Sequence, residues 1–228
     1  MSNNGNGKNG WRTQPMYSFR EVAHLSHVSI STVRNWLLGY TTEQGEVEPL
    51  FKEHPAEEKA CSFLQLIEIV VAAKFRKAEH APFKTVRHAY DNARKLYKPD
   101  YPFASLELKA IGGHIVYIMR VPGASLQALD RPEQFTIPDL VQETIGQLEY
   151  EYELASRWYP AGKDIPIVVD PRISAGVPVV KDRGVTVEAI HRRFKAKQKM
   201  EFIAKDFALK VGVVEEIIRF NFREIVAV

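Results

Sequence analysis

The chain has 228 residues, with 31 Lys and Arg against 28 Asp and Glu, and a single cysteine. One cysteine excludes an intramolecular disulfide framework and a cysteine-rich zinc module, and it favours the reducing cytoplasm. No run approaches the about 18 apolar residues of a membrane-spanning helix, and the N-terminus lacks the apolar core of a signal peptide, so we expect no membrane partner. The net charge of +3 leaves nucleic-acid binding open, because that depends on where the charge lies.

The first hundred residues are predicted to form a tail followed by helices. Residues 1–16 are rich in Asn and Gly and are predicted to form a disordered tail. Two short helices are expected between residues 18 and 38, and a polar, hairpin-like loop over 41–58. Two longer helices follow, one over 62–79, which Ser62 caps, and one from Pro82 to about Tyr97.

The strand signals lie in the second half of the chain. Residues 106–129 are predicted to be strand-like, because apolar side chains alternate there after a Gly112-Gly113 turn. The alternating sets are Ile115, Tyr117 and Met119 against Val116, Ile118 and Arg120. The elements expected next are a helix from Pro138 to about Tyr150, a strand over 152–158, short strands over 165–169 and 177–180 around the turn at Asp170-Pro171, and helices over 186–196, 199–207 and 212–223.

These elements predict a fold that is mainly α with small β elements, of the α+β class. At this length the chain has room for two domains. The predicted division is a disordered tail over 1–16, a DNA-binding domain over 17–100, a β-rich connecting segment over 101–163, and a C-terminal domain over 164–228 made of a β-hairpin and three helices.

Residues 17–40 are the most informative segment. Ser18 followed by Glu21 is a capping box, residues 26–28 make a turn, and Ser29 caps a second helix. Helical spacing buries Val33, Trp36 and Leu37. The outer face that remains consists of Ser31, Thr32, Arg34 and Asn35.

The chemistry of this outer face suits DNA. Asn pairs with adenine and Arg with guanine in the major groove, whereas hydroxyl groups and N-terminal amides bind phosphates. We therefore predict DNA binding through Ser31, Thr32, Arg34 and Asn35, with Arg20 and Tyr40 beside them. The alternative is that the two amphipathic helices form only a corner of a helical core.

Positive charge is concentrated in two segments. Residues 74–98 hold eight basic against two acidic residues, a net charge of +6, and residues 181–205 hold eight against three, a net charge of +5. Candidate phosphate contacts within them are Lys84, Arg87, Arg192 and Arg193. The alternative for each cluster is a solvated helix face. Residues 41–60, by contrast, hold six Glu against two Lys, a net charge of −4.

Residues 17–97 resemble the MerR-type winged helix–turn–helix. That family places a wing after the recognition helix and braces it with a helix pair, which implies a wing over 39–51 and a pair over 62–79 and 83–97. Two features depart from the family pattern. His27 stands where such turns usually have Gly, and the wing is acidic, which opposes its contact with phosphate.

The C-terminal part resembles the domain of unknown function family 433. The residues that carry the resemblance are Ile167, Asp170-Pro171-Arg172-Ile173, Gly176, Pro178-Val179-Val180, Gly184, Ile190, Phe194 and 203–207. The helical pieces themselves outline a second, homeodomain-like helix–turn–helix. One departure is the stretch Lys195-Ala196-Lys197, where the family usually has a Gly after its first helix.

A MerR-like head joined to this tail resembles the larger VapB-type antitoxins of bacterial toxin–antitoxin pairs. The resemblance implies a cytoplasmic homodimer that binds the operator DNA of its own operon as a repressor. It also implies a toxin partner, a PIN-like metal-dependent ribonuclease, which the antitoxin neutralises. Two other hypotheses stay open: a ligand-responsive MerR-like transcription regulator with an effector held by residues 100–160, and an interaction module that only docks a toxin.

The sequence gives no sign of catalysis, so we expect neither an enzyme nor a cofactor. His24 and His27 have no third ligand at metal-binding spacing, and the phosphate-loop, dinucleotide and nucleophile-elbow motifs are absent. Cys61 is expected to be a small core residue. Asp170 and Arg172 are expected to be a turn residue beside a structural arginine rather than a catalytic pair.

Overall fold

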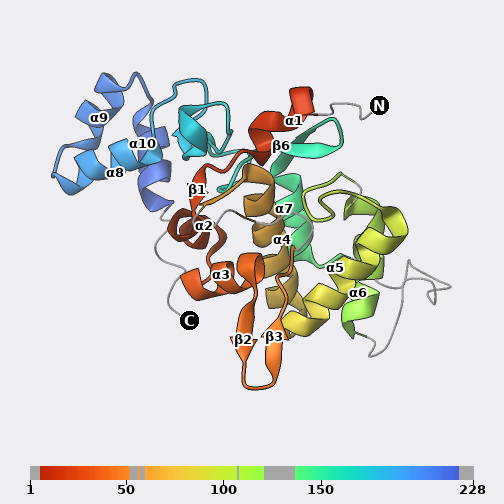
Figure 1. Cartoon of the computed structure of the whole chain (residues 1–228). Coiled ribbons are helices and arrows are strands. Elements are labelled where there is room, and N and C mark those ends of the chain that lie inside the picture. The colour runs from red at the N-terminus through yellow and green to blue at the C-terminus, as the bar shows by residue number, and fades with distance from the viewer. Residues whose placement is uncertain (1–5, 52–55, 57–59, 107, 121–136, 221–228) are drawn as a thin grey trace. The chain divides into compact units, whose positions relative to one another are not determined.

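A computed structural model describes residues 6–51, 56, 60–106, 108–120 and 137–220 (Figure 1). This part of the chain is mainly helical with a few short strand pairs, which confirms the mixed α+β class. It divides into two compact units, the first of Met1–Ile145 with Tyr150–Ala155 and the second of Gly146–Glu149 with Ser156–Val228. The chain passes between the units after Ile145 and again within each strand of the pair β5 (Leu148–Glu151) and β6 (Leu154–Trp158).

The first unit is built around one buried helix. Its described helices are α1 (Asn6–Thr13), α2 (Phe19–Ser26), α3 (Ile30–Leu38), α4 (Phe63–Glu79), α5 (Phe83–Tyr97), α6 (Leu108–Arg120) and α7 (Asp139–Gly146). Every residue from Phe63 to Ala72 of α4 is buried. Tyr90 of α5 makes edge-to-face contacts with Phe51 and Phe103, at ring-centroid distances of 5.2 and 5.1 Å, and so ties two loops to the helical core.

Both longer helices of this unit begin and end as predicted. Ser62 and Gln65 form a reciprocal capping box at the start of α4, and α5 starts directly after Pro82. His80 and Lys98 end the two helices in the left-handed conformation. The capping residues of α4 and the proline before α5 lie at the helix ends themselves, so local sequence determines these boundaries.

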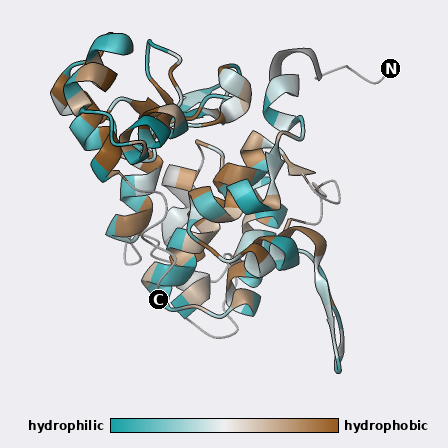
Figure 2. Ribbon diagram, turned by 90° about the vertical axis from the view of Figure 1, so that its left-hand side faces the viewer, coloured by the Kyte–Doolittle hydropathy of each residue, from teal (hydrophilic) through white to brown (hydrophobic). Residues whose placement is uncertain are grey.

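The first unit also has two small antiparallel strand pairs. β1 (Tyr17–Ser18) pairs with β4 (Ala60–Cys61), and Tyr17 lies opposite Cys61. β2 (Tyr40–Thr42) pairs with β3 (Gly45–Val47), which confirms a hairpin directly after α3. In both views the β2–β3 hairpin extends away from the helices of its unit (Figures 1 and 2).

The predicted disordered tail is wrong for residues 6–16. Residues 6–13 form α1, and Arg12 is fully buried. The Nη2 atom of Arg12 lies 3.4 Å from a carboxylate oxygen of Glu151, and its guanidinium stacks 4.3 Å from the Trp11 ring centroid. A long-range ion pair and a cation–π contact thus hold a segment whose own composition disfavours a helix. Residues 1–5 of the predicted tail lie outside the described part.

The predicted strand over 106–129 is also wrong where the structure describes it. Residues 108–120 form α6, and residues 121–129 lie outside the described part. Leu108, Gly112, Ile115 and Val116 are buried, a helical i, i+4, i+7, i+8 stripe. A Cβ atom at Gly112 would overlap the side chain of Ile137, so the glycine serves close packing rather than a turn. The connecting segment 101–163 accordingly contains α6 and α7 as well as β5 and β6, and is not simply β-rich.

The second unit follows the predicted order of elements. β7 (Ile167–Val168) and β8 (Val179–Val180) form an antiparallel pair, with the short 3-10 turn η3 (Ser174–Gly176) between them. The three helices that follow are α8 (Val187–Lys195), α9 (Met200–Asp206) and α10 (Val211–Arg219). They pack on one another through a small core of Val187, Ile190, Ile203, Ala204, Val214 and Ile217 (Figure 1).

Within the described residues, no helix combines the length and the apolar character needed to cross a membrane.

Candidate nucleic-acid interface

Capping residues fix the ends of helices α2 and α3 and the tight turn that joins them. The Glu21 N–H donates to Ser18 Oγ at 3.3 Å, and the Ser18 N–H donates to the Glu21 carboxylate at 2.7 Å. His27 ends α2 in the left-handed region, with φ of +57°. The Thr32 N–H donates to Ser29 Oγ at 3.0 Å, which confirms Ser29 as the N-cap of α3.

The inner face of α3 is fixed to the rest of the unit. Val33, Trp36 and Leu37 are buried, as predicted, and the Trp36 ring stacks on Phe83 of α5 at a centroid distance of 6.1 Å. The Leu50 N–H donates to the Trp36 carbonyl at 2.7 Å, which ties the chain after the β2–β3 hairpin to α3. The orientation of α3 is therefore set by packing on one face only, and the other face is left to solvent.

The outer face of α3 brings the four predicted residues together. Ser31 and Arg34 are exposed, and Thr32 and Asn35 are partly exposed. The Ser29 Oγ atom lies 2.8 Å from both Ser31 Oγ and Thr32 Oγ1, so three hydroxyl groups cluster at the N-terminus of α3. Backbone amides and hydroxyls at a helix N-terminus are suited to a phosphate oxygen.

The remaining residues predicted for this interface flank α3. Arg20 is exposed on α2, and Tyr40 is 39% exposed at the start of β2. The sequence did not single out Ile30 and Leu38, which are 48% and 38% exposed on α3. An exposed apolar side chain on such a helix can contact a thymine methyl group. Their position in the helical pattern, outside the buried stripe, was the signal that could have found them.

The turn between α2 and α3 lies beside a positively charged part of α4. Burial, together with the smaller effects of the charges of Lys74, His24 and Lys77, lowers the pKa of His27 from 6.5 to about 4. His27 is therefore neutral at physiological pH. Lys77 is exposed and Lys74 partly so, which places two cations close to the turn although they are some fifty residues away in sequence.

The β2–β3 hairpin carries the opposite charge. Glu43, Glu46 and Glu48 are all exposed along it and just after it. A row of carboxylates in this position repels a phosphate backbone. The basic residues of α4 and the acidic hairpin thus belong to the same unit.

The four candidate phosphate contacts have different surroundings. Lys84 and Arg192 are exposed. The Arg87 guanidinium lies 4.8 Å from the Phe83 ring centroid and is largely withdrawn from solvent. Arg193 donates to the Asp206 carboxylate at 2.6 Å and stacks on Phe207 at 4.9 Å. Of these four residues, only Lys84 and Arg192 have neither an ion pair nor a ring contact with another described residue.

Asp170 organises a buried polar network in the second unit. It accepts hydrogen bonds from Arg157 Nε at 2.7 Å, from Arg172 Nη2 at 2.9 Å and from the Arg172 N–H at 2.9 Å. Burial alone would raise the pKa of Asp170, but the hydrogen bonds from Arg172 and Arg157 outweigh it and lower the pKa below its usual value. These contacts close the turn after β7 and agree with a structural role for the pair.

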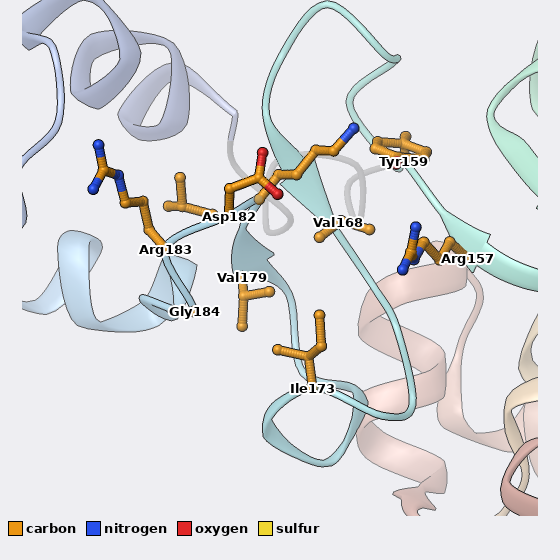
Figure 3. A pocket seen from close by; sticks show the side chains of 10 residues that line it. Arg157, Tyr159, Val168, Ile173, Val179, Asp182, Arg183 and Gly184 are labelled. Carbon is orange, nitrogen blue, oxygen red and sulfur yellow. The ribbon is translucent and has the colours of Figure 1, made fainter.

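A pocket of about 270 Å³ lies beside this network. Val168, Ile173 and Val179 gather at its centre, with Arg157 on one side and Arg183 on the other (Figure 3). The Lys181 ammonium lies 5.4 Å from the Tyr159 ring centroid at its rim. From the described part of the predicted effector segment 100–160, only Arg157 and Tyr159 line this pocket.

The described residues show no grouping of His, Cys, Asp and Glu that could hold a metal ion. Cys61 is a buried free thiol that donates to the Tyr17 carbonyl at 3.5 Å. Burial, and then the charge of Glu21, raise its pKa far above the usual range. The thiol is therefore protonated and packed in the core, as the sequence predicted.

Comparison with known proteins identifies a shared fold. No protein-family model matches the chain, and no curated protein matches it. The crystal structure of Rv2018 from Mycobacterium tuberculosis is similar, with a TM-score of 0.68 and 20% sequence identity. The similarity covers 90% of this chain and 97% of that one. At this identity the two proteins share the fold, and the likeness extends over both units.

Proposed function

We propose that this chain is a DNA-binding antitoxin that represses its own operon. The first unit acts as a MerR-like winged helix–turn–helix, in which α3 is the recognition helix and the β2–β3 hairpin is the wing. The observation that carries the proposal is the exposed outer face of α3, where Ser31, Thr32, Arg34 and Asn35 come together on a helix held firmly from behind.

Each residue of this face has a role in the proposed complex. Arg34 reads guanine and Asn35 reads adenine in the major groove, because their side chains match those base edges. The hydroxyl cluster of Ser29, Ser31 and Thr32 binds a backbone phosphate together with the first amides of α3. Arg20 on α2, Tyr40 at the start of β2, and Lys74 and Lys77 near the α2–α3 turn supply further contacts to the DNA backbone.

The resemblance of the two parts to VapB-type antitoxins supports the rest of the proposal. The protein acts in the cytoplasm as a homodimer and reads two half-sites about one helical turn apart. Its second unit, a β-hairpin with a homeodomain-like helix trio, belongs to the toxin-neutralising assembly. The partner is a PIN-like ribonuclease, which co-purification with the product of the neighbouring gene would detect.

The DNA-binding role is tested by two substitutions on α3. Arg34→Ala and Asn35→Ala each remove a base contact worth about 1–3 kcal/mol, so each is expected to weaken operator binding by about fivefold or more. The measurement is a gel shift with the DNA upstream of the chain's own gene. Circular dichroism checks that the fold is retained.

Arg219→Ala is the matched control for this test. It removes an exposed arginine from α10, outside the proposed interface, and is expected to bind like the parent. If the Arg34 and Asn35 variants also bind like the parent, α3 is not the recognition helix.

A second candidate function is a ligand-responsive regulator with the same DNA-binding unit. The pocket of about 270 Å³ favours it, since an apolar centre with cationic sides suits a small carboxylate. A thermal-shift screen with small organic acids tests this reading. An effector that stabilises the parent but not a Lys181→Ala variant supports it, and the absence of any stabilising acid contradicts it.

A further inference from the structure

An open hollow of about 380 Å³ lies at the turn between α8 and α9. Lys197, Gln198 and Lys199 of the turn line it, together with Phe202 and Asp206 of α9. Phe202 is 62% exposed, although burial of a phenylalanine side chain is worth about 1.5–3 kcal/mol. An aromatic ring, two ammonium groups and an amide therefore share one small surface.

The charge of this hollow is positive. Its one acidic lining residue, Asp206, accepts a hydrogen bond from Arg193 at 2.6 Å, which balances the carboxylate. Lys197 and Lys199 have no ion-pair partner among the described residues and are exposed. The positive surface continues over Arg192, Lys195 and Lys205, all exposed on the two helices.

The turn that presents these groups is well fixed. Three N–H groups donate back to α8: Ala196 to Arg192 at 3.0 Å, Lys197 to Phe194 at 2.9 Å and Gln198 to Arg193 at 3.2 Å. Lys197 is held with φ of +63°, in the left-handed region that favours glycine. The backbone of the turn is therefore ordered before a ligand binds, and only the side chains lose freedom on binding.

Duplex DNA is a poor match for this unit. In a homeodomain-like trio the last helix enters the major groove. The outer face of α10 carries Glu215, Glu216 and Arg219, two carboxylates against one guanidinium. Moreover, the bases of a duplex are already stacked on one another, so they leave no free face for Phe202. An unpaired base offers both of its faces.

We propose that the α8–α9 turn binds single-stranded nucleic acid. One unpaired base stacks on Phe202, its neighbouring phosphates bind Lys197 and Lys199, and Gln198 donates to or accepts from the base edge. This combination of an aromatic platform and cations recognises RNA and single-stranded DNA by the same chemistry. The site is separate from α3 and works independently of the operator contact.

The test uses the full chain and two labelled eight-nucleotide strands, oligo-uridine and oligo-deoxythymidine, in fluorescence anisotropy. Phe202→Ala is expected to weaken binding by about tenfold, the loss of one stacked base. The double variant Lys197→Gln, Lys199→Gln is expected to reduce the slope of log affinity against log salt by about 1.4, since each phosphate contact on a single strand contributes about 0.7. Binding of either strand in this way supports the proposal.

Two controls separate this site from other causes. Tyr152→Ala removes a 68% exposed aromatic ring elsewhere, and Arg34→Ala removes the proposed operator contact; both are expected to bind the strands like the parent. The proposal is overturned if Phe202→Ala binds like the parent. It is equally overturned if duplex DNA or an acidic peptide such as oligo-glutamate displaces the strands as well as unlabelled single strand does.

Discussion

Glu68 is an ionisable residue placed inside the core of the first unit. It lies on α4 and is 1% exposed. Its Oε1 atom accepts the N–H groups of Phe103 and Ala104, at 2.7 and 2.9 Å, and so ties the loop before α6 to α4. Burial raises the pKa of Glu68, the nearby Tyr90 hydroxyl and these amides offset only part of the rise, and the resulting pKa is about 8. At neutral pH the side chain is mostly protonated.

This pKa predicts how stability depends on pH. Between the usual pKa of 4.5 and about 8, the folded chain binds a proton at Glu68 that the unfolded chain has lost, so stability falls as pH rises through this window. Glu68→Gln is always neutral and removes this slope. We expect the variant to gain a few kcal/mol over the parent between pH 5 and pH 8, at about 1.4 kcal/mol per pKa unit. Calorimetry across that range measures it.

Glu153→Gln, at an exposed position of the same unit, serves as the control for Glu68. It is expected to leave the pH profile unchanged. A Glu68→Gln profile parallel to that of the parent would mean that the carboxyl group is ionised in the core.

His27 combines backbone strain with a charge penalty. A non-glycine residue in the left-handed region costs about 1–2 kcal/mol, and His27 has φ of +57°. Its folded pKa, about 4, lies below the usual 6.5, so the unfolded chain binds more protons between these values and the parent loses stability as pH falls through them. His27→Gly is therefore expected to raise stability by about 1 kcal/mol at pH 7, and by more at pH 5. Urea unfolding at the two pH values is the measurement.

His80→Gly is the matched variant for this prediction. His80 also ends a helix with positive φ, +48°, but its side chain is exposed. It relieves backbone strain alone, so the gain at pH 5 and pH 7 is expected to be the same. If His27→Gly shows the same gain at both pH values, the pKa of His27 is not lowered in the folded chain.

At the scale of the element, local signals predicted boundaries and long-range contacts decided the exceptions. α4 was predictable because Ser62 and Gln65 are three residues apart and an apolar run follows. α1 was not, because its stability depends on Arg12 reaching Glu151, 139 positions along the chain. In α6, the alternation of side chains after Gly112-Gly113 predicted a strand, but the structure buries a stripe at helical spacing instead.

The candidate interface also combines residues that the local sequence predicts with contacts that only tertiary packing creates. Ser31, Thr32, Arg34 and Asn35 were predictable because a 3.6-residue period separates them from the buried face of their own helix. The approach of Lys74 and Lys77 to the turn was not, since it follows from how α4 packs against α2. The withdrawal of Arg87 over Phe83 and the pairing of Arg193 with Asp206 likewise depend on tertiary neighbours.

At the scale of the whole molecule, the net charge of +3 is the small difference between basic and acidic segments whose charges largely cancel. Basic residues flank the outer face of α3 and cover the α8–α9 turn, whereas Glu43, Glu46 and Glu48 line the hairpin that follows α3 directly. Exposed charges act over about 10 Å at 0.1 M salt. The hairpin follows α3 directly in the chain, so its charges are expected to oppose the DNA contact proposed for α3.

Neutralising the hairpin is therefore expected to strengthen operator binding. The triple variant Glu43→Gln, Glu46→Gln, Glu48→Gln should bind the operator several-fold more tightly at low salt, and the gain should fade above about 0.3 M as the Debye length shortens. The control triple Glu188→Gln, Glu201→Gln, Glu216→Gln changes the net charge by the same three units at exposed positions of the second unit. Because the total charges match, only the placement of the charge distinguishes the two variants. Equal gains for both would mean that net charge, and not the hairpin, sets the affinity.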